Sequence, residues 1–447
     1  MKEEVSTEEN LAKAKEPMDI SMKLHSFYKG KLEVVPKCRI SSLKDFGLWS
    51  TPGIAAPCLE IKKHPNKVFE YTNKGNFVAV VSDGTRVLGL GDIGPEAALP
   101  VMEGKAISFK YLGGVDAFPV CLGTKDPDEI IQACKWLGPT FGGINLEDIA
   151  APKCFYILEK LRGEMDIPVW HDDQQGAATA VLAGLINALK IVGKKKKEVN
   201  ISMIGAGAAN TGVLRLMIRY GFSPGNIIMA DVNGILYKGR QGLMAPEYTG
   251  VRTLYDLTNK ERRTGAIPET MKESDVCIAF STPGPGIIKP EWVKSMADDA
   301  IVFACANPVP EIWPWEAKKA GARIVATGRS DFPNQISNLL VFPAVFRGAL
   351  DVAARTITDE MCIAAAVELA RLAEDKGLKE DYIIPRVDEW EIFPHEAVAF
   401  GMKAIEQGVA GITMTRDELF EKASKTIKRA RDETKMLMDT GFIPKHE

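Results

Sequence analysis

The stretch that decides the class of fold is 198–222, EVNISMIGAGAANTGVLRLMIRYGF. A short apolar run leads into a glycine-rich turn, and an amphipathic segment with helical spacing follows. Gly205 and Gly207 would let the backbone approach a pyrophosphate, which the N-terminus of the following helix attracts. The stretch therefore predicts the first strand–turn–helix unit of a doubly wound, Rossmann-like dinucleotide-binding domain.

The residues after this unit continue the pattern. The next strand-like run ends at Asp231, where a carboxylate can accept hydrogen bonds from ribose hydroxyls. Asn210 stands where a third glycine is usual, which predicts looser packing of the helix on its strand; Ala208 and Asn210 join the two glycines as expected cofactor contacts. Three more runs each close on a polar or Gly/Pro loop: 275–286 (DVCIAFSTPGPG), 300–310 (AIVFACANPVP) and 322–331 (ARIVATGRSD).

The first half of the chain alternates strand-like and helical runs, which predicts βαβ units with parallel strands. The run 76–92 (NFVAVVSDGTRVLGLGD) reads as two strands around an Asp-Gly turn, a hairpin signal, and 105–122 (KAISFKYLGGVDAFPVCL) supplies two more β-rich runs. The later runs, in order, are 126–138 (helix), 139–148 (strand), 149–163 (helix) and 167–173 (strand).

Acidic residues end two successive strands of this half. Glu147 and Asp148 end one, and Asp172 and Asp173 end the next. Parallel strands present their carboxyl ends at one edge of the sheet, so these side chains are expected to converge. Each pair can simply cap the following helix, but desolvated neighbouring acids are costly unless a cation or donors face them. Two such pairs favour a Mg²⁺ or Mn²⁺ site built from oxygen ligands.

Bulk properties narrow the function. A length of 447 residues predicts two or three domains, and a net charge of −3 gives no reason to expect nucleic acid or a membrane surface as partner. The eight cysteines are scattered singly, which is typical of reduced thiols in a cytoplasmic protein. No apolar run reaches membrane-spanning length.

We expect an α/β chain in four parts. Residues 1–23 form a mobile or helical extension, and 24–175 form a substrate and metal domain with parallel βαβ units. Residues 176–400 form a Rossmann-like NAD(P)-binding domain, and 401–447 form C-terminal helices.

Several blocks resemble the malic enzyme family, from about residue 24 to past 410. They are 71–76 (YTNKGN), 81–110 (VSDGTRVLGLGDIGPEAALPVMEGKAISFK), 142–154 (GGINLEDIAAPKC), 171–176 (HDDQQG), 307–311 (NPVPE) and 326–335 (ATGRSDFPNQ). The resemblance to short bacterial and archaeal members implies oxidative decarboxylation of L-malate, a small dicarboxylate, to pyruvate and CO₂. It also implies NAD⁺ or NADP⁺, Mg²⁺ or Mn²⁺, and a homodimer or homotetramer.

The resemblance gives the paired acids separate roles. It implies that Glu147, Asp148 and Asp173 bind the metal, and that Asp172 pairs with Lys105, the base that removes the hydroxyl proton. Spacing alone places Lys105 at the start of a strand, where a surface lysine is the ordinary interpretation. The resemblance further implies substrate contacts from three residues: Arg86, Asn307 and Asn338. It implies that Asn307 contacts the cofactor as well.

One position departs from the family in a way that bears on chemistry. Ser50, in 49–57 (WSTPGIAAP), stands where the resemblance implies a tyrosine that protonates C3 of enolpyruvate. A serine hydroxyl is a poorer proton donor than a phenol and is a ring shorter. Either a water relayed by Ser50 or the phenol of Tyr71 would have to replace it.

Three functions remain open from the sequence. The leading one is a malic-enzyme-type oxidoreductase for malate or a related 2-hydroxy acid. A non-catalytic paralogue that binds dinucleotide or dicarboxylate is favoured by Ser50 and Ser337 and opposed by the complete set of metal ligands with Lys105. Metal-dependent oxaloacetate decarboxylation without hydride transfer is supported by Asn210 alone.

Overall fold

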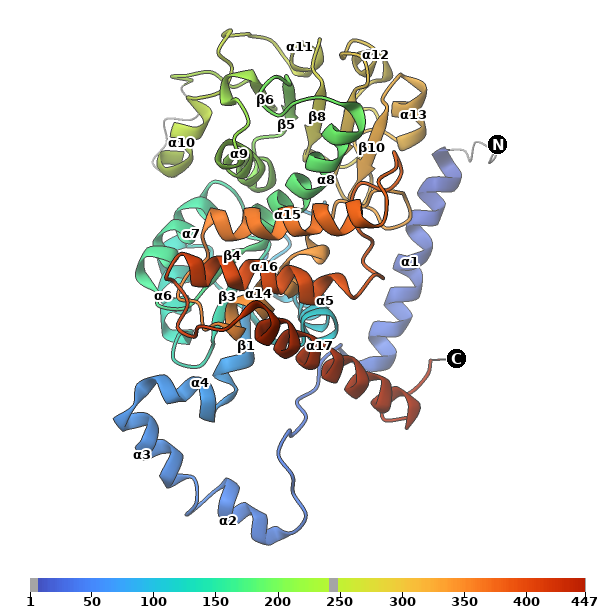
Figure 1. The fold of residues 1–447 in the computed structure, drawn as a ribbon. Coiled ribbons are helices and arrows are strands. Elements are labelled where there is room, and N and C mark those ends of the chain that lie inside the picture. Colours follow the sequence, from blue (N-terminus) through green and yellow to red (C-terminus); the bar gives the residue numbers. More distant parts are fainter. Residues whose placement is uncertain (1–6, 241–247, 447) are drawn as a thin grey trace.

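A computed structural model describes residues 7–240 and 248–446, which form two parallel sheets with helices around each (Figure 1). The smaller sheet has four parallel strands in the order β2-β1-β3-β4. Its strands are β1 (Phe77–Ser82), β2 (Asp116–Cys121), β3 (Gly143–Leu146) and β4 (Val169–His171). The connecting helices are α5 (Pro95–Gly113), α6 (Pro127–Leu137) and α7 (Lys153–Glu164).

The larger sheet has six strands in the order β10-β9-β8-β5-β6-β7, all parallel except the β6–β7 pair. The strand order reverses direction at β5, which confirms the doubly wound fold. Its strands are β5 (Ile201–Ile204), β6 (Ile227–Asp231), β7 (Gly234–Ile235), β8 (Val276–Ala279), β9 (Ile301–Ala304) and β10 (Ile324–Thr327). Its helices are α8 (Ala177–Val192), α9 (Ala208–Tyr220), α10 (Thr249–Tyr255), α11 (Ile267–Met271), α12 (Pro290–Val293) and α13 (Pro314–Lys319).

Of the last four helices, the first, third and fourth contact α5 beside the smaller sheet, and the second packs against α8 and α9. The rings of Phe342 and Phe346 lie 4.6 and 5.3 Å from that of Phe109 on α5, so the end of the chain packs against its first half (Figure 1). These helices are α14 (Phe342–Asp351), α15 (Asp359–Asp375), α16 (Ile392–Glu406) and α17 (Arg416–Asp439).

The hairpin predicted over 76–92 is wrong. Only β1 forms, and β2 and β3 already pair in parallel with its two edges, so no edge is left for a hairpin partner. After β1, Asp83 accepts hydrogen bonds from the backbone N–H and the hydroxyl of Thr85. The chain then forms a loop, residues 83–94, whose ends meet where the backbone N–H groups of Ile93 and Gly94 donate to the Gly84 carbonyl, and which contains a bridge between Val87 and Gly91.

The strand predicted to begin at Lys105 is also wrong, because Lys105 lies inside α5. The bulky residues of 105–112 suggested a strand, but the buried positions follow helical spacing: Ala98, Met102, Ala106, Phe109 and Leu112. Packing of this face on the sheet overrides the local β preference.

The N-terminal residues pack little against the body. Helix α1 (Thr7–Tyr28) extends beyond the boundary expected at residue 23, and the helical form of the predicted extension is the one observed. Residues 31–72, here called the N-terminal arm, bury no side chain. Figure 1 shows two of its helices well away from both sheets. The arm contains η1 (Leu43–Asp45), α2 (Phe46–Trp49), α3 (Ala55–Lys63), η2 (Pro65–Lys67) and α4 (Val68–Tyr71).

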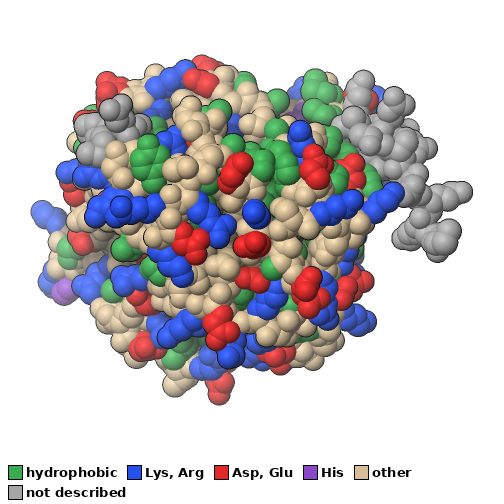
Figure 2. All heavy atoms as spheres, turned by 90° about the horizontal axis from the view of Figure 1, so that it is seen from above, with side chains coloured by type: hydrophobic (Ala, Val, Ile, Leu, Met, Phe, Trp, Pro, Cys, Tyr) green, Lys and Arg blue, Asp and Glu red, His purple; other side chains and the backbone are tan. Residues whose placement is uncertain are grey.

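One segment of the described chain, Asp172–Val192, has the length and apolar composition of a membrane span, with a mean hydropathy of 1.4. The sequence alone did not predict such a run, because the five-residue turn before α8 adds to its length. Of its apolar window, 78% is buried inside the protein, as in a core helix. Figure 2, viewed over the six-stranded half, shows basic and acidic side chains interspersed, without a continuous basic area.

Candidate active site

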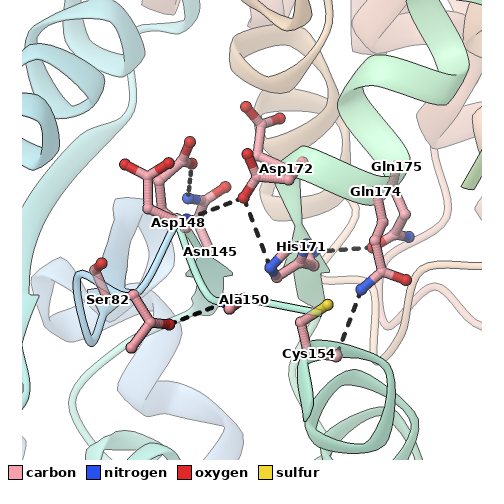
Figure 3. Close-up of polar contacts among 12 residues, drawn as sticks. Ser82, Asn145, Asp148, Ala150, Cys154, His171, Asp172, Gln174 and Gln175 are labelled. Carbon is pink, nitrogen blue, oxygen red and sulfur yellow. Dashed lines mark hydrogen bonds and ion pairs between the residues drawn. The ribbon is translucent and has the colours of Figure 1, made fainter. Parts of the chain in front are cut away.

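The acids predicted to converge do so at the carboxyl edge of the smaller sheet. β3 and β4 pair in parallel with Leu146 opposite His171, so the residues that follow each strand are neighbours. Carboxylate oxygens of Glu147, Asp148 and Asp173, here called the acidic cluster, all lie within 4.8 Å of one another. Figure 3 shows Asp148 and Asp172 at the two neighbouring strand ends.

The acidic cluster has more negative charge than its surroundings balance. Burial and the charge of Asp173 raise the pKa of Asp148 to about 8, and burial raises the pKa of Glu147 well above its usual range. The Asp148 Oδ2 atom is buried and has no hydrogen-bond partner among the described residues. A bound cation would relieve this desolvation and repulsion, and oxygen-only ligands suit Mg²⁺ or Mn²⁺, so these residues fit a divalent metal.

Lys105 lies beside the acidic cluster with its ammonium group fixed. Its Nζ is 2.6 Å from Asp172 Oδ2 and 3.1 Å from Glu147 Oε1. Burial alone would lower the pKa of Lys105, but the attraction of these two carboxylates outweighs burial and raises it. The side chain predicted to be an ordinary surface lysine is therefore a buried cation.

Asp172 and Asp173 differ in their partners, although they are adjacent. Asp172 is fully buried and saturated with donors, because Trp170 Nε1 donates to its Oδ1 at 2.9 Å and Asn338 Nδ2 donates to its Oδ2 at 2.5 Å. Asp173 turns toward the other two members of the acidic cluster, and its carboxylate accepts a hydrogen bond from the backbone N–H of Asp148 at 2.9 Å. Asp172 is thus paired with Lys105, and Asp173 belongs to the group of carboxylates that could hold a metal ion.

Two more predicted substrate contacts lie around this edge. Arg86 is exposed, and its backbone N–H donates to the Asp148 carbonyl at 3.0 Å. Asn307 is exposed after β9, at the boundary between the halves. A Cβ on Gly89 would lie 2.9 Å from the Asn307 carbonyl oxygen and 2.8 Å from Pro283 Cγ. The loop 83–94 of the first half therefore contacts the loops that follow β8 and β9 in the dinucleotide-binding half.

The glycine turn after β5 has the geometry that a phosphate requires. Gly205 has φ +97°, and a Cβ there would lie 2.3 Å from the Phe280 carbonyl oxygen. Gly207 faces open space directly before Ala208, the first residue of α9. Asn210 does not loosen this turn, because its Nδ2 donates to the carbonyls of Ile204 and Gly205 at 2.9 Å each.

Close packing comes from a glycine that the sequence reasoning missed. A Cβ on Gly212 would lie 2.2 Å from the Gln174 carbonyl oxygen, so α9 rests directly on the turn that holds Asp172 and Asp173. The signal was present as a third glycine in the same turn-and-helix stretch, two residues later than expected.

Asp231 ends β6 as predicted but is already engaged. Arg240 Nη2 donates to both of its carboxylate oxygens, at 2.7 and 2.9 Å, and the backbone N–H of Asn233 donates to Oδ1 at 2.8 Å. Arg240 was not identified from the sequence, where only its position in the loop after the strand could have suggested a role.

Ser50 and Tyr71 are not brought to the acidic cluster of their own chain. Ser50 directly follows α2 and Tyr71 ends α4, so both belong to the N-terminal arm (Figure 1). Tyr71 is 44% exposed and lies beside the Lys67 ammonium.

Comparison with known proteins agrees with this geometry. Residues 29–162 match the malic enzyme N-terminal domain, and residues 174–407 match the malic enzyme NAD-binding domain. The chain belongs to the malic enzyme family. The resemblance inferred from the sequence blocks is thereby confirmed. The reaction of the family is oxidative decarboxylation of malate with NAD or NADP, and a divalent metal is typical of its members.

Similar proteins span nearly the whole chain. The bifunctional malic/malolactic enzyme of Bacillus subtilis is 49% identical over 405 residues, which cover 91% of this chain and 97% of that protein. The crystal structure of the Entamoeba histolytica malic enzyme is 46% identical, with a TM-score of 0.96 over 100% of this chain and 93% of its own. The Pyrococcus horikoshii malic enzyme structure is 52% identical, with a TM-score of 0.85 over 90% of this chain and 96% of its own.

Proposed function

We propose that this chain oxidatively decarboxylates L-malate to pyruvate and CO₂, using NAD⁺ or NADP⁺. Residues 24–175 would carry substrate and metal, and 176–400 the dinucleotide. The observation that carries the proposal is the ion pair between Lys105 and Asp172 beside the acidic cluster, which gives a proton acceptor and a metal site at one sheet edge. A protein that only binds dicarboxylate has little need of a proton acceptor.

The acidic cluster would hold the metal, which when bound supplies positive charge to the oxygens of the reacting carbon and of its carboxylate. Lys105 removes the hydroxyl proton while C2 loses a hydride to the nicotinamide. Its ammonium would first pass a proton to solvent water, and this would be easier if Glu147 held a cation and attracted Nζ less. Asp172 keeps Nζ aimed at the substrate throughout.

Two side chains at the mouth of the site would orient malate. The exposed Arg86 guanidinium is suited to a carboxylate, which it can grip with two parallel N–H groups. The amide of Asn338, 2.5 Å from Asp172, lies where it can donate to a substrate oxygen next to Lys105. Asn307 would face the same substrate from the cofactor side.

Decarboxylation of the oxidised acid leaves enolpyruvate, and a proton at C3 completes pyruvate. Ser50 and Tyr71 lie on the N-terminal arm, so either can supply that proton only to the cluster of another copy. We propose an oligomer in which a second copy covers the arm. Apolar side chains of the arm support this, since Val34 is 88%, Leu43 86% and Leu48 66% exposed.

Light scattering tests the oligomer. Leu43→Asp should lower the molar mass in solution, because it places a charge in the covered surface. Leu257→Asp, at a site that is 52% exposed outside the arm, should not. A native protein that is monomeric at micromolar concentration would contradict the proposal.

The reaction is tested with L-malate and Mn²⁺, following reduced cofactor and pyruvate separately. Equal yields support the proposal. Pyruvate from oxaloacetate without reduced cofactor from malate would indicate the decarboxylase, which Asn210 no longer favours because it fixes the glycine turn. If neither reduced cofactor nor pyruvate forms, the result would indicate the non-catalytic binding protein.

We also propose a cytoplasmic location. All eight cysteines are free, and five of them are buried, which suits a reducing compartment. Fractionation of the native host would test this, and recovery of the protein with membranes or outside the cell would contradict it.

A further inference from the structure

We propose that Glu311 is a positioning residue that ties together the loops after β8 and β9, so that the nicotinamide half of the dinucleotide meets a preformed site. These loops are residues 280–289, here called the β8 loop, and residues 305–313, here called the β9 loop. The inference rests on the proposed function, because it concerns the half of the cofactor that accepts the hydride. Glu311 would act through the two loops, without touching the cofactor itself.

The two loops start side by side and share one carboxylate. β8 and β9 pair in parallel with Ala279 opposite Ala304, so the residues that follow each strand are neighbours. Glu311 is fully buried near the end of the β9 loop. Its Oε1 accepts the backbone N–H of Ser281 at 2.8 Å and the Ser281 hydroxyl at 3.0 Å, and its Oε2 accepts the backbone N–H of Ala306 at 3.0 Å. Each oxygen of the carboxylate thus holds a different loop.

The position of these loops identifies the half of the cofactor that they meet. A dinucleotide lies across the strand ends of a doubly wound sheet, with one half on each side of the glycine turn after β5. β8 and β9 lie on the side of β5 away from β6. A Cβ on Gly89 would lie 2.8 Å from Pro283 of the β8 loop and 2.9 Å from the Asn307 carbonyl oxygen of the β9 loop. A hydride passes only between groups in contact, so the nicotinamide belongs beside the loops that face the substrate-binding half.

Asn307, proposed to contact both substrate and cofactor, directly follows the peptide group that Glu311 holds. The other side of Asn307 is closed by the loop after β10, because a Cβ on Gly328 would lie 2.7 Å from Asn307 Nδ2. Arg329 of the same loop donates from Nη1 to the Pro308 carbonyl at 2.9 Å. Asn307 is therefore fixed between two neighbouring loops, and Glu311 supplies its connection to the β8 loop.

The bridge needs a carboxylate and not merely a polar side chain of the same shape. Burial raises the pKa of Glu311, and the N–H groups of Ala306 and Ser281 act against that shift, since they favour the charged form. A glutamine has one acceptor oxygen and one NH₂ group. It could accept from one loop, but its NH₂ would face an N–H donor of the other. Glu311→Gln should therefore release one loop while it preserves the volume of the side chain.

A purely structural role for Glu311 predicts a different result. If the carboxylate only stabilises the domain, its loss affects every ligand of the domain alike. If it positions the two loops, its loss weakens only those ligands that carry a nicotinamide ring.

The experiment measures the binding of NAD⁺ and of ADP-ribose by calorimetry, so that the nicotinamide ring is the difference and turnover is not needed. NADP⁺ and 2′-phospho-ADP-ribose form a second pair, and the pair that the native protein binds more tightly is used. Glu311→Gln should weaken binding of the dinucleotide by about tenfold, as for the loss of one hydrogen bond to a charged group. Binding of the ADP-ribose ligand should stay within about twofold.

Glu316→Gln is the matched control. The Glu316 carboxylate accepts a backbone N–H from Trp313 at 3.3 Å, but it caps α13 and joins no loops. Both affinities of this variant should stay within about twofold of the native values. Equal weakening of both ligands by Glu311→Gln, or an unchanged affinity for the dinucleotide, overturns the inference.

Hydrogen exchange of the native protein without ligand provides an independent arm if Glu311→Gln does not fold. The amides of Ser281 and Ala306 should be protected, because they donate to a buried carboxylate. Rapid exchange at either amide would mean that the bridge does not hold the loops before the cofactor binds, and it would overturn the inference. A selective loss of dinucleotide binding in a protein that does not oxidise malate would support the inference and refute the proposed function alone.

Discussion

Acids at two sheet edges differ in what faces them. Asp231, the last residue of β6, and Asp172, the residue after β4, each meet a fixed cation, Arg240 at 2.7 Å and Lys105 at 2.6 Å. Among the described residues, the lysine or arginine within ion-pair distance of the three carboxylates of the acidic cluster is Lys105, whose Nζ lies 3.1 Å from Glu147. The difference shows that an acid at a strand end is not by itself a ligand site. The acids whose negative charge the described residues do not balance are the ones expected to bind an ion from outside.

Replacing a proposed metal ligand of the acidic cluster should have the largest effect on activity. Asp173→Asn is expected to abolish Mn²⁺ binding and to reduce metal-dependent turnover by about a thousandfold or more, because a ligand is lost. Calorimetry with Mn²⁺ and malate assays measure the two effects. Asp166→Asn, at an exposed aspartate before β4, is the matched control. Tight Mn²⁺ binding by Asp173→Asn would exclude Asp173 as a ligand.

Replacing Lys105, the cation that contacts both Asp172 and Glu147, should have the second largest effect. Lys105→Ala is expected to lower malate oxidation by about a hundredfold to ten-thousandfold, the range for a positioned general base. Binding of reduced dinucleotide, followed by fluorescence, should persist. Lys110→Ala removes a lysine of the same helix that pairs with Asp116 and Glu433 away from the cluster, and it should remain active. Normal turnover of Lys105→Ala would end its assignment as base.

A substitution at Gly212 tests the contact between α9 and the turn that holds Asp172 and Asp173. Gly212→Ala should destabilise the fold by about 1–3 kcal/mol, since its Cβ would lie 2.2 Å from the Gln174 carbonyl oxygen. Gly163→Ala, in α7 with no atom within 4 Å of the new Cβ, should be neutral or slightly stabilising. Urea unfolding compares them, and equal stabilities would mean that α9 does not rest on that turn.

The smallest effect concerns pH. Burial and Asp173 raise the pKa of Asp148 from 3.8 to about 8, so the folded, metal-free protein holds a proton that the unfolded chain has lost. The stability contributed by this group must therefore fall as the pH rises from about 4 to 8. Mn²⁺ needs the deprotonated carboxylate, so its shift of Tm should be larger at pH 8 than at pH 5.5. A shift independent of pH would contradict the raised pKa.

Strand ends were the part of the molecule that the sequence predicted well. Apolar runs of four to six residues that close on acids or glycines become the buried strands, because both faces of a parallel sheet exclude water. The convergence of Asp148 with Asp173 follows from that alone.

Features that depend on distant packing were not predictable. Lys105 lies in a helix because its neighbours pack on the sheet, whatever their local preference. The pairing of Arg240 with Asp231, nine positions apart, depends on how the eight residues between them fold back. The N-terminal arm has ordinary amphipathic composition, and only the structure reveals that its own chain leaves it uncovered.

The close approach of α9 to the Gln174 carbonyl at Gly212 has a thermodynamic consequence. Helix α9 begins at the turn expected to receive the pyrophosphate, and it touches the backbone of Gln174, the residue after Asp173. A dinucleotide that steadies α9 is expected to steady Asp173, the proposed metal ligand behind it, as well. Linkage makes this reciprocal, so each of the two should raise the affinity for the other by the same factor.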